Sequence, residues 1–126
     1  MQAGSKKTIL IIEDDPMVLS ATASLVSAWG YDVLMAGSAD EAMKKSTALG
    51  RAPDLIIIDY GLSGEQTGLD AYSAISQLYS EFIPGIVITG ETTPSLMDKL
   101  DKIGLPHLMK PINPEALEQS LPVLLA

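Results

Sequence analysis

The sequence predicts an α/β domain in which a doubly wound, five-stranded parallel sheet has helices on both faces. One observation is the alternation of short apolar runs with longer segments whose apolar residues recur at helical spacing, which happens five times along the chain. The other is the run Leu55–Ile58, which is wholly apolar, mostly β-branched and too short for a helix of usual length. Such a run is typical of a parallel strand buried on both faces. We therefore expect a (βα)5 topology.

The five expected strands differ in how apolar they are. The first and third are almost wholly apolar and are expected to be buried on both faces, whereas the second is more polar and is expected nearer a sheet edge. The fifth is interrupted early by Pro106. In chain order, the expected strands are residues 8–12, 31–35, 55–58, 86–88 and 105–109.

The expected helices begin at recognisable signals. Asp15-Pro16, Thr93-Pro94 and Asn113-Pro114 each place a capping residue before a proline at the first helical position. Ser38–Glu41 forms a capping box. In chain order, the expected helices are residues 16–29, 39–50, 69–82, 94–103 and 114–124.

Apolar periodicity predicts which helix faces are buried. In the first helix the predicted inward residues are Val18, Thr22, Leu25 and Trp29, with Leu19 and Val26 beside them. In the third helix they are Leu69, Tyr72, Ile75, Tyr79 and Phe82. In the last two helices they are Leu96, Leu100, Ile103, Leu117, Leu121 and Leu124.

Composition limits the possible partners and locations. The 126 residues suffice for one domain, which we expect over residues 7–126, with residues 1–6 as a linker. A formal net charge of −8 makes the chain a poor partner for nucleic acid or an anionic membrane and suits a divalent cation or a basic protein surface. There is no cysteine, and no apolar run is long enough to cross a membrane. We therefore expect a cytoplasmic protein.

Polar residues follow four of the expected strands. Glu13 and Asp14 end the first strand, Asp59 the third, Thr89 the fourth and Lys110 the fifth. Because crossovers between parallel strands are right-handed, the carboxyl ends of all strands open on one edge of the sheet, where ligands bind. Three carboxylates, one hydroxyl and one ammonium are therefore expected to share a rim.

This set of groups favours one kind of chemistry. Crowded carboxylates repel one another, and a hard divalent cation such as Mg²⁺ relieves that repulsion through oxygen ligands. Thr89 can donate a hydrogen bond to a phosphoryl oxygen, and Lys110 supplies a positive charge for the same group. Asp59 is then a nucleophile that forms an acyl phosphate, because phosphoryl transfer needs mainly positioning and charge neutralisation.

With these residues in place, the chain resembles a response-regulator receiver domain of two-component signalling from about Lys7 to Leu124. The resemblance, and not the pattern itself, implies a flavodoxin-like fold with strand order 2-1-3-4-5. It implies that Asp59 accepts a phosphoryl group from a phosphohistidine on a histidine kinase or a histidine phosphotransfer protein. It also implies that Asp14, Asp59 and the Gly61 main-chain carbonyl bind Mg²⁺ directly and that Glu13 acts through water.

The resemblance implies further roles and shows some departures. Thr89 and Lys110 would bind the phosphoryl group and shift the last two β-α units between states. Gly61 and Glu91 lie where the family tunes hydrolysis. The position three residues before the lysine is usually aromatic in the family and here is His107, which could modulate the signalling face or simply be a half-exposed strand residue.

Details also resemble receivers at the carboxyl end of hybrid histidine kinases. These are Asp59-Tyr60-Gly61-Leu62, Thr67-Gly68-Leu69-Asp70, Ile88-Thr89-Gly90 and Gly104-Leu105-Pro106. A homodimer is possible. Since no DNA-binding segment follows Leu124, the expected output is through protein contacts or onward phosphotransfer.

Other functions remain open at this point. A pseudo-receiver would keep the fold as a protein-interaction module and would not accept phosphate. A phosphatase of the haloacid-dehalogenase type would need a second aspartate two residues after the nucleophile, where this chain has Gly61. A flavodoxin-like electron carrier shares the fold class, but the acidic rim would repel a flavin phosphate. We expect no enzyme activity beyond the domain's own phosphorylation and dephosphorylation.

Overall fold

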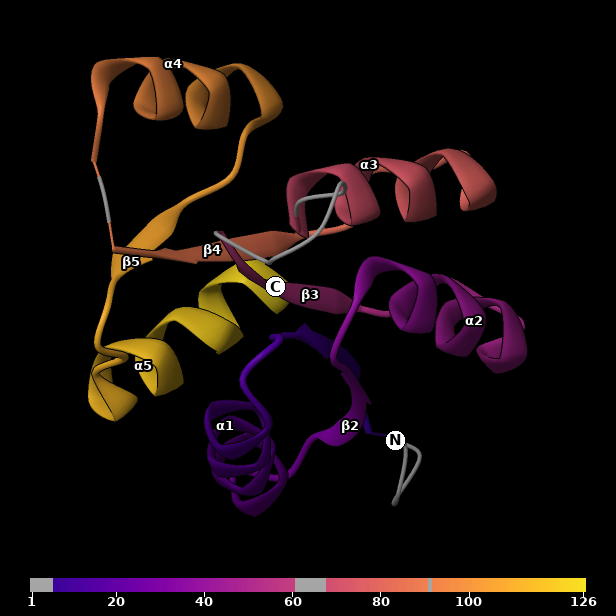
Figure 1. Ribbon diagram of the computed structural model, residues 1–126. Helices are drawn as coiled ribbons and strands as arrows, with labels where there is room; N and C mark the ends of the chain where they lie inside the picture. The colour runs from indigo at the N-terminus through magenta and orange to yellow at the C-terminus, as the bar shows by residue number, and fades with distance from the viewer. Residues whose placement is uncertain (1–5, 61–67, 91) are drawn as a thin grey trace.

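A computed structural model describes residues 6–60, 68–90 and 92–126. Within these residues, five strands and five helices alternate (Figure 1). The strands are β1 (Thr8–Ile12), β2 (Asp32–Ala36), β3 (Leu55–Asp59), β4 (Gly85–Thr89) and β5 (His107–Met109). The helices are α1 (Pro16–Ala28), α2 (Ala39–Leu49), α3 (Gly68–Tyr79), α4 (Pro94–Ile103) and α5 (Pro114–Leu125).

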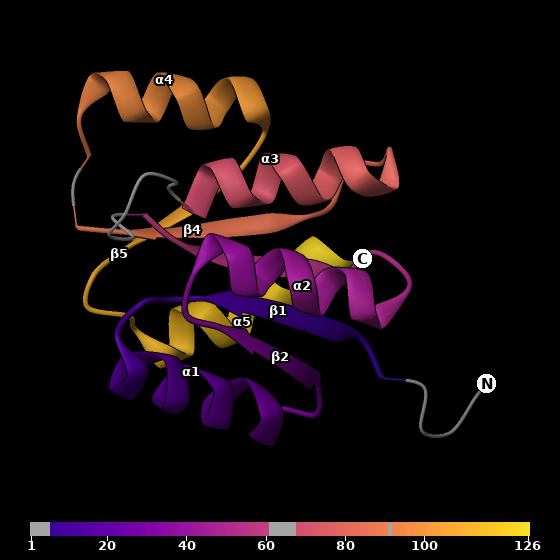
Figure 2. The same cartoon turned by 45° about the vertical axis from the view of Figure 1, so that its right-hand side comes forward.

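All strand pairs are parallel, and the order across the sheet is β2-β1-β3-β4-β5. The expected doubly wound α/β fold and its strand order are confirmed. Helices α1 and α5 cover one face, while α2, α3 and α4 cover the other (Figures 1 and 2). None of the described helices is long and apolar enough to cross a membrane.

The two helical layers explain why the central strands lack an alternating pattern. Every residue of β1, β3 and β4 is buried. Along β1, Ile9 and Ile11 pack on the α1–α5 side, whereas Leu10 and Ile12 pack on the α2–α4 side. Only β2 among the first four strands is largely half-exposed, as expected for an edge strand.

The predicted starts of α1, α2, α4 and α5 are confirmed, and a side chain caps each of them. Asp15 accepts hydrogen bonds from the Met17 and Val18 N–H groups at 2.9 and 3.3 Å. Ser38, Thr93 and Asn113 accept equivalent bonds at the starts of α2, α4 and α5. Each bond satisfies a first-turn donor that the helix itself cannot.

The predicted inward face of α1 is partly wrong. Its buried residues are Leu19, Thr22, Ala23 and Val26. Val18 is 37% exposed, and both Val18 and Leu25 line a cleft rather than the core. Apolar residues occupy more than one face of this helix, so their spacing alone did not select the buried one.

Two other predicted boundaries differ by more than one residue. α3 ends at Tyr79, because Ser80 adopts a left-handed conformation with φ of 51° that stops the helix. Phe82 therefore leaves the helical register and is 62% exposed, while Ile83 is buried in its stead. β5 begins at His107 and not at residue 105, since Pro106 has no N–H to donate to a sheet.

Candidate functional site

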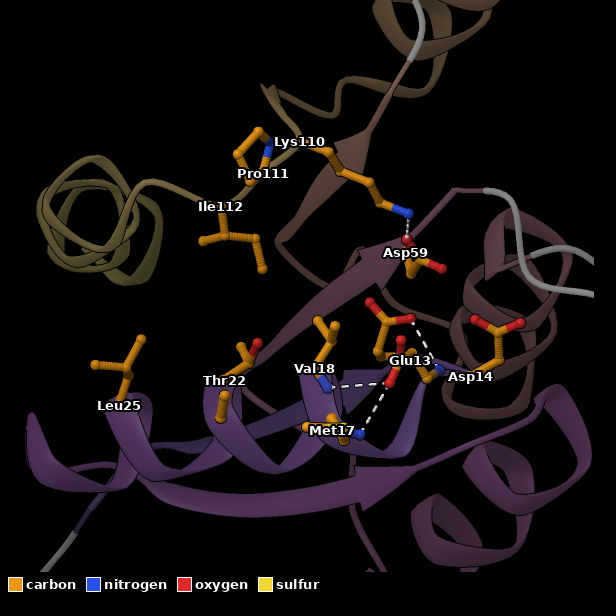
Figure 3. A pocket seen from close by; sticks show the side chains of 12 residues that line it. Glu13, Asp14, Met17, Val18, Thr22, Leu25, Asp59, Lys110, Pro111 and Ile112 are labelled. Atoms are coloured by element: carbon orange, nitrogen blue, oxygen red, sulfur yellow. Dashed lines mark hydrogen bonds and ion pairs between the residues drawn. The ribbon is translucent and has the colours of Figure 1, made fainter.

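The strand register brings the predicted site residues to one edge of the sheet. β1 and β3 end in register, which puts Glu13 level with Asp59. Lys110 directly follows β5, and its N–H donates to the Thr89 carbonyl at 2.8 Å. Figure 3 shows the Glu13, Asp14, Asp59 and Lys110 side chains around one end of a cleft. The predicted convergence of strand ends is therefore present in the structure.

Three carboxylates lie together at this edge. Glu13, Asp14 and Asp59 each place an oxygen within 4.8 Å of the other two. Glu13 is only 7% exposed and Asp59 only 3%, while Asp14 is more exposed than either. Burial of like charges at this distance is unfavourable unless a proton or a cation compensates for it.

Glu13 shows the cost of this crowding. Burial raises the pKa of Glu13 to about 7, and the neighbouring Asp59 charge adds to the effect. The Asp15 N–H opposes it by donating to a Glu13 carboxylate oxygen at 3.1 Å. The Glu13 main chain is held in turn by the Ala36 carbonyl, to which its N–H donates at 3.0 Å.

Lys110 compensates part of the negative charge. Its ammonium forms an ion pair with the buried Asp59 carboxylate, so that the ends of β3 and β5 are linked (Figure 3). Partial burial lowers the pKa of Lys110, but the hydrogen bond and charge of Asp59 outweigh this and raise it above its ordinary value. The lysine therefore stays charged beside Asp59.

The described donors fit a hard divalent cation. All three donors are carboxylates, the ligand type that Mg²⁺ prefers, and such an ion keeps several bound waters through which a carboxylate such as Glu13 can also act. Two further candidates cannot be placed, because Gly61 and Glu91 lie outside the described residues.

A cleft of about 790 Å³ extends from the acidic cluster along α1. One wall is formed by α1 and the other by the segment after β5, where Pro111 and Ile112 lie (Figure 3). Met17 at the mouth is 82% exposed, and Val18 beside it is 37% exposed. These apolar lining residues were not among the predicted site residues. The sequence signal for them was the surplus of apolar positions on α1, which exceeds what one buried face needs.

Three further residues, Thr89, His107 and Gly68, do not line the cleft. Thr89 is fully buried at the end of β4 and does not line the cleft. His107 is half-buried, pairs with Val87 across the sheet and is also absent from the cleft lining. Gly68, at the start of α3, was also missed: a Cβ there would lie 2.6 Å from the Asp59 carbonyl oxygen. The glycine thus allows α3 to approach the main chain of Asp59 closely.

Comparison with known proteins decides the family. A model of the response regulator receiver domain matches residues 9–122. The chain belongs to this family. The receiver domain is 30% identical to the transcriptional regulatory protein AruR of Pseudomonas aeruginosa over 119 residues. The aligned region is 86% of this chain and 45% of AruR. It is 25% identical to the transcriptional regulatory protein ZraR of Klebsiella oxytoca over 125 residues. The aligned region is 98% of this chain and 27% of ZraR.

Solved structures agree with this assignment. The receiver domain matches the chemotaxis protein CheY4 of Vibrio cholerae with a TM-score of 0.83 and 26% identity, over 95% of this chain and 99% of CheY4. It matches the receiver domain of the hybrid histidine kinase CckA with a TM-score of 0.77 and 28% identity, over 94% of this chain and 99% of that one. The chain spans less than half the length of AruR and ZraR.

Proposed function

We propose that this receiver domain accepts a phosphoryl group on Asp59 from a phosphohistidine and signals by a change in its binding surface. The observation that carries the proposal is the position of Asp59. Its carboxylate lies between the acidic Glu13–Asp14 pair and the Lys110 ammonium, at the inner end of a cleft that is open to a partner. The two-component family as a whole supports the same role.

The site residues divide the work of phosphoryl transfer. An Asp59 oxygen attacks the phosphorus, and the histidine nitrogen leaves with the electrons of the broken bond. Lys110 stays near the transferred group and neutralises part of its charge, and the Thr89 hydroxyl donates to a phosphoryl oxygen once the group is present. Asp14, Asp59 and the Gly61 carbonyl would hold Mg²⁺, with Glu13 acting through water. The cation supplies further neutralisation of the phosphoryl oxygens.

The cleft supports a protein donor. Its apolar walls suit the side of a helix that carries the phosphohistidine, and the net charge of −8 favours a basic partner surface. A histidine kinase or a histidine phosphotransfer protein in the cytoplasm meets these requirements. The likeness to the CckA receiver is compatible with a place in a hybrid kinase, and association into a homodimer is compatible with the proposal.

Intact-protein mass spectrometry tests the proposal. With acetyl phosphate and Mg²⁺, the parent domain should gain the mass of one phosphoryl group, and Asp59→Asn should not. Asp40→Asn, which removes an exposed carboxylate from the first turn of α2, should behave like the parent. If neither a small-molecule nor a protein donor phosphorylates the parent domain, it is a pseudo-receiver. The domain needs no other enzyme activity for this role.

A further inference from the structure

β2 is an edge strand of the sheet, and no strand among the described residues pairs with its outer side. It pairs with β1 on its inner side, and Figure 2 shows it at the margin of the sheet between α1 and α2. Val33, Leu34 and Met35 are all half-buried, so this margin is apolar but reaches solvent. An edge strand with free main-chain groups is a template for another strand.

The hydrogen-bond ladder shows which main-chain groups face outward. The Asp32 N–H donates to the Lys7 carbonyl at 2.9 Å, and the Ala36 carbonyl accepts from the Glu13 N–H at 3.0 Å, so both residues face β1. Successive residues of a strand direct these groups alternately to its two sides. Leu34 therefore also faces β1, whereas Val33 and Met35 direct their N–H and carbonyl groups away from the sheet.

Lys45 occupies this outer side. It extends from α2, and its ammonium donates a hydrogen bond to the Met35 carbonyl. The same lysine lines a groove of about 430 Å³ between β2 and α2 whose other lining residues are Val33, Leu34, Met35, Ala48 and Leu49. Lys44, the preceding residue on α2, is exposed and does not line this groove.

We propose that the outer edge of β2 is a strand-pairing surface for a second copy of this chain and that Lys45 keeps it closed. The outward groups are self-complementary about a twofold axis at Leu34. In an antiparallel pair of two β2 strands, Val33 of one copy would lie opposite Met35 of the other, and each such pair would exchange two hydrogen bonds. Lys45 blocks the pairing because its ammonium already binds the Met35 carbonyl and stands where the second strand would lie. Two such ammonium groups would also repel each other.

Light scattering after size exclusion tests this inference, over a range of protein concentrations and at about 0.15 M salt to screen the net charge. Lys45→Ala should show an average mass that rises from one copy toward two at concentrations where the parent chain shows no change. Lys44→Ala removes the same charge from the next residue and should match the parent. If Lys45→Ala also matches the parent, the inference is wrong. Lys45→Met, which keeps the apolar stem, replaces Lys45→Ala with the same outcomes if the alanine variant does not fold.

A second substitution identifies the surface involved. Val33→Pro removes an outward N–H and no hydrogen bond to β1, which an edge strand tolerates. Added to Lys45→Ala, it should return the average mass to that of the parent. Association that persists in the double variant runs through another face and overturns the inference. Neither readout depends on phosphorylation, so the inference stands or falls separately from the role of Asp59.

Discussion

At the scale of single residues, the acidic cluster links charge to stability. Glu13 is buried beside Asp59, and burial raises its pKa to about 7 from an ordinary value of 4.5. Between these values the folded chain binds more protons at this position than the unfolded chain does. The free energy of unfolding therefore loses a contribution from Glu13 as the pH rises from about 4.5 to about 7.

This sign gives a pH prediction for the metal-free chain. The urea midpoint of Glu13→Gln should rise relative to the urea midpoint of the parent as the pH rises from about 5 to about 7.5. In this pH range the raised pKa makes Glu13 lose its proton in the folded parent, and the variant has no such group. Excess Mg²⁺ at the upper pH should recover stability in the parent more than in the variant, because only the parent has the full carboxylate set. If the difference between the two urea midpoints does not change with pH, the pKa of Glu13 is not raised in the folded chain.

Gly68 makes a second prediction at this scale. A methyl group there would lie 2.6 Å from both the Asp59 carbonyl oxygen and the Ile58 Cγ2 atom. Gly68→Ala should therefore lower the free energy of unfolding by about 1–3 kcal/mol, as overpacking does. Gly90→Ala is the matched control, because a Cβ at Gly90 meets nothing within 4 Å, and it should change stability by less than about 0.5 kcal/mol. Equal effects of the two substitutions in urea titrations would contradict this reading.

At the scale of elements, helix ends decide where side chains lie. The four capped starts were readable because polar residues before proline or in a capping box have a local physical effect. The end of α3 was not readable, since it depends on Ser80, a residue type that does not usually adopt a positive φ. This single residue moved Phe82 from the expected core to the surface.

A serine-to-glycine substitution should change the free energy of unfolding in opposite directions at the end of α3 and inside it. Glycine adopts the left-handed conformation of residue 80 without the steric strain that serine has there. Ser80→Gly should therefore raise the free energy of unfolding by about 1 kcal/mol. Ser73→Gly, at an exposed position inside α3, should lower it by about 0.5 kcal/mol through loss of helix propensity. Thermal or urea unfolding of both variants checks the pair, and a loss of stability in Ser80→Gly would exclude strain at Ser80.

At the scale of the whole molecule, topology fixes the site. Glu13, Asp14, Asp59 and Lys110 could be placed from the sequence because every strand of a parallel sheet ends at the same edge. The cleft beside them could not, because it depends on how α1 is rotated against the segment after β5. A rotation of this kind is set by packing across the whole domain and leaves only a weak mark in the periodicity of α1.

If the cleft binds the protein donor, a substitution in it should slow phosphorylation by a phosphohistidine protein and leave phosphorylation by acetyl phosphate unchanged. Met17 is 82% exposed at its mouth, whereas Val123 on α5 is 75% exposed and does not line it. Met17→Asp should slow phosphotransfer from a cognate phosphohistidine protein about tenfold or more, as loss of an apolar contact at an interface does. It should leave phosphorylation by acetyl phosphate unchanged, and Val123→Asp should change neither rate. Equal slowing by both variants would show that the cleft is not where the donor binds.

The most direct test of the account is to find which residue carries the acyl phosphate. The parent domain is phosphorylated in the presence of Mg²⁺ and treated with borohydride, which reduces an aspartyl phosphate to homoserine, and peptides are then sequenced by mass spectrometry. The role proposed for Asp59 predicts homoserine at position 59 alone. Homoserine at position 14 or at another aspartate, with Asp59 unchanged, would contradict it.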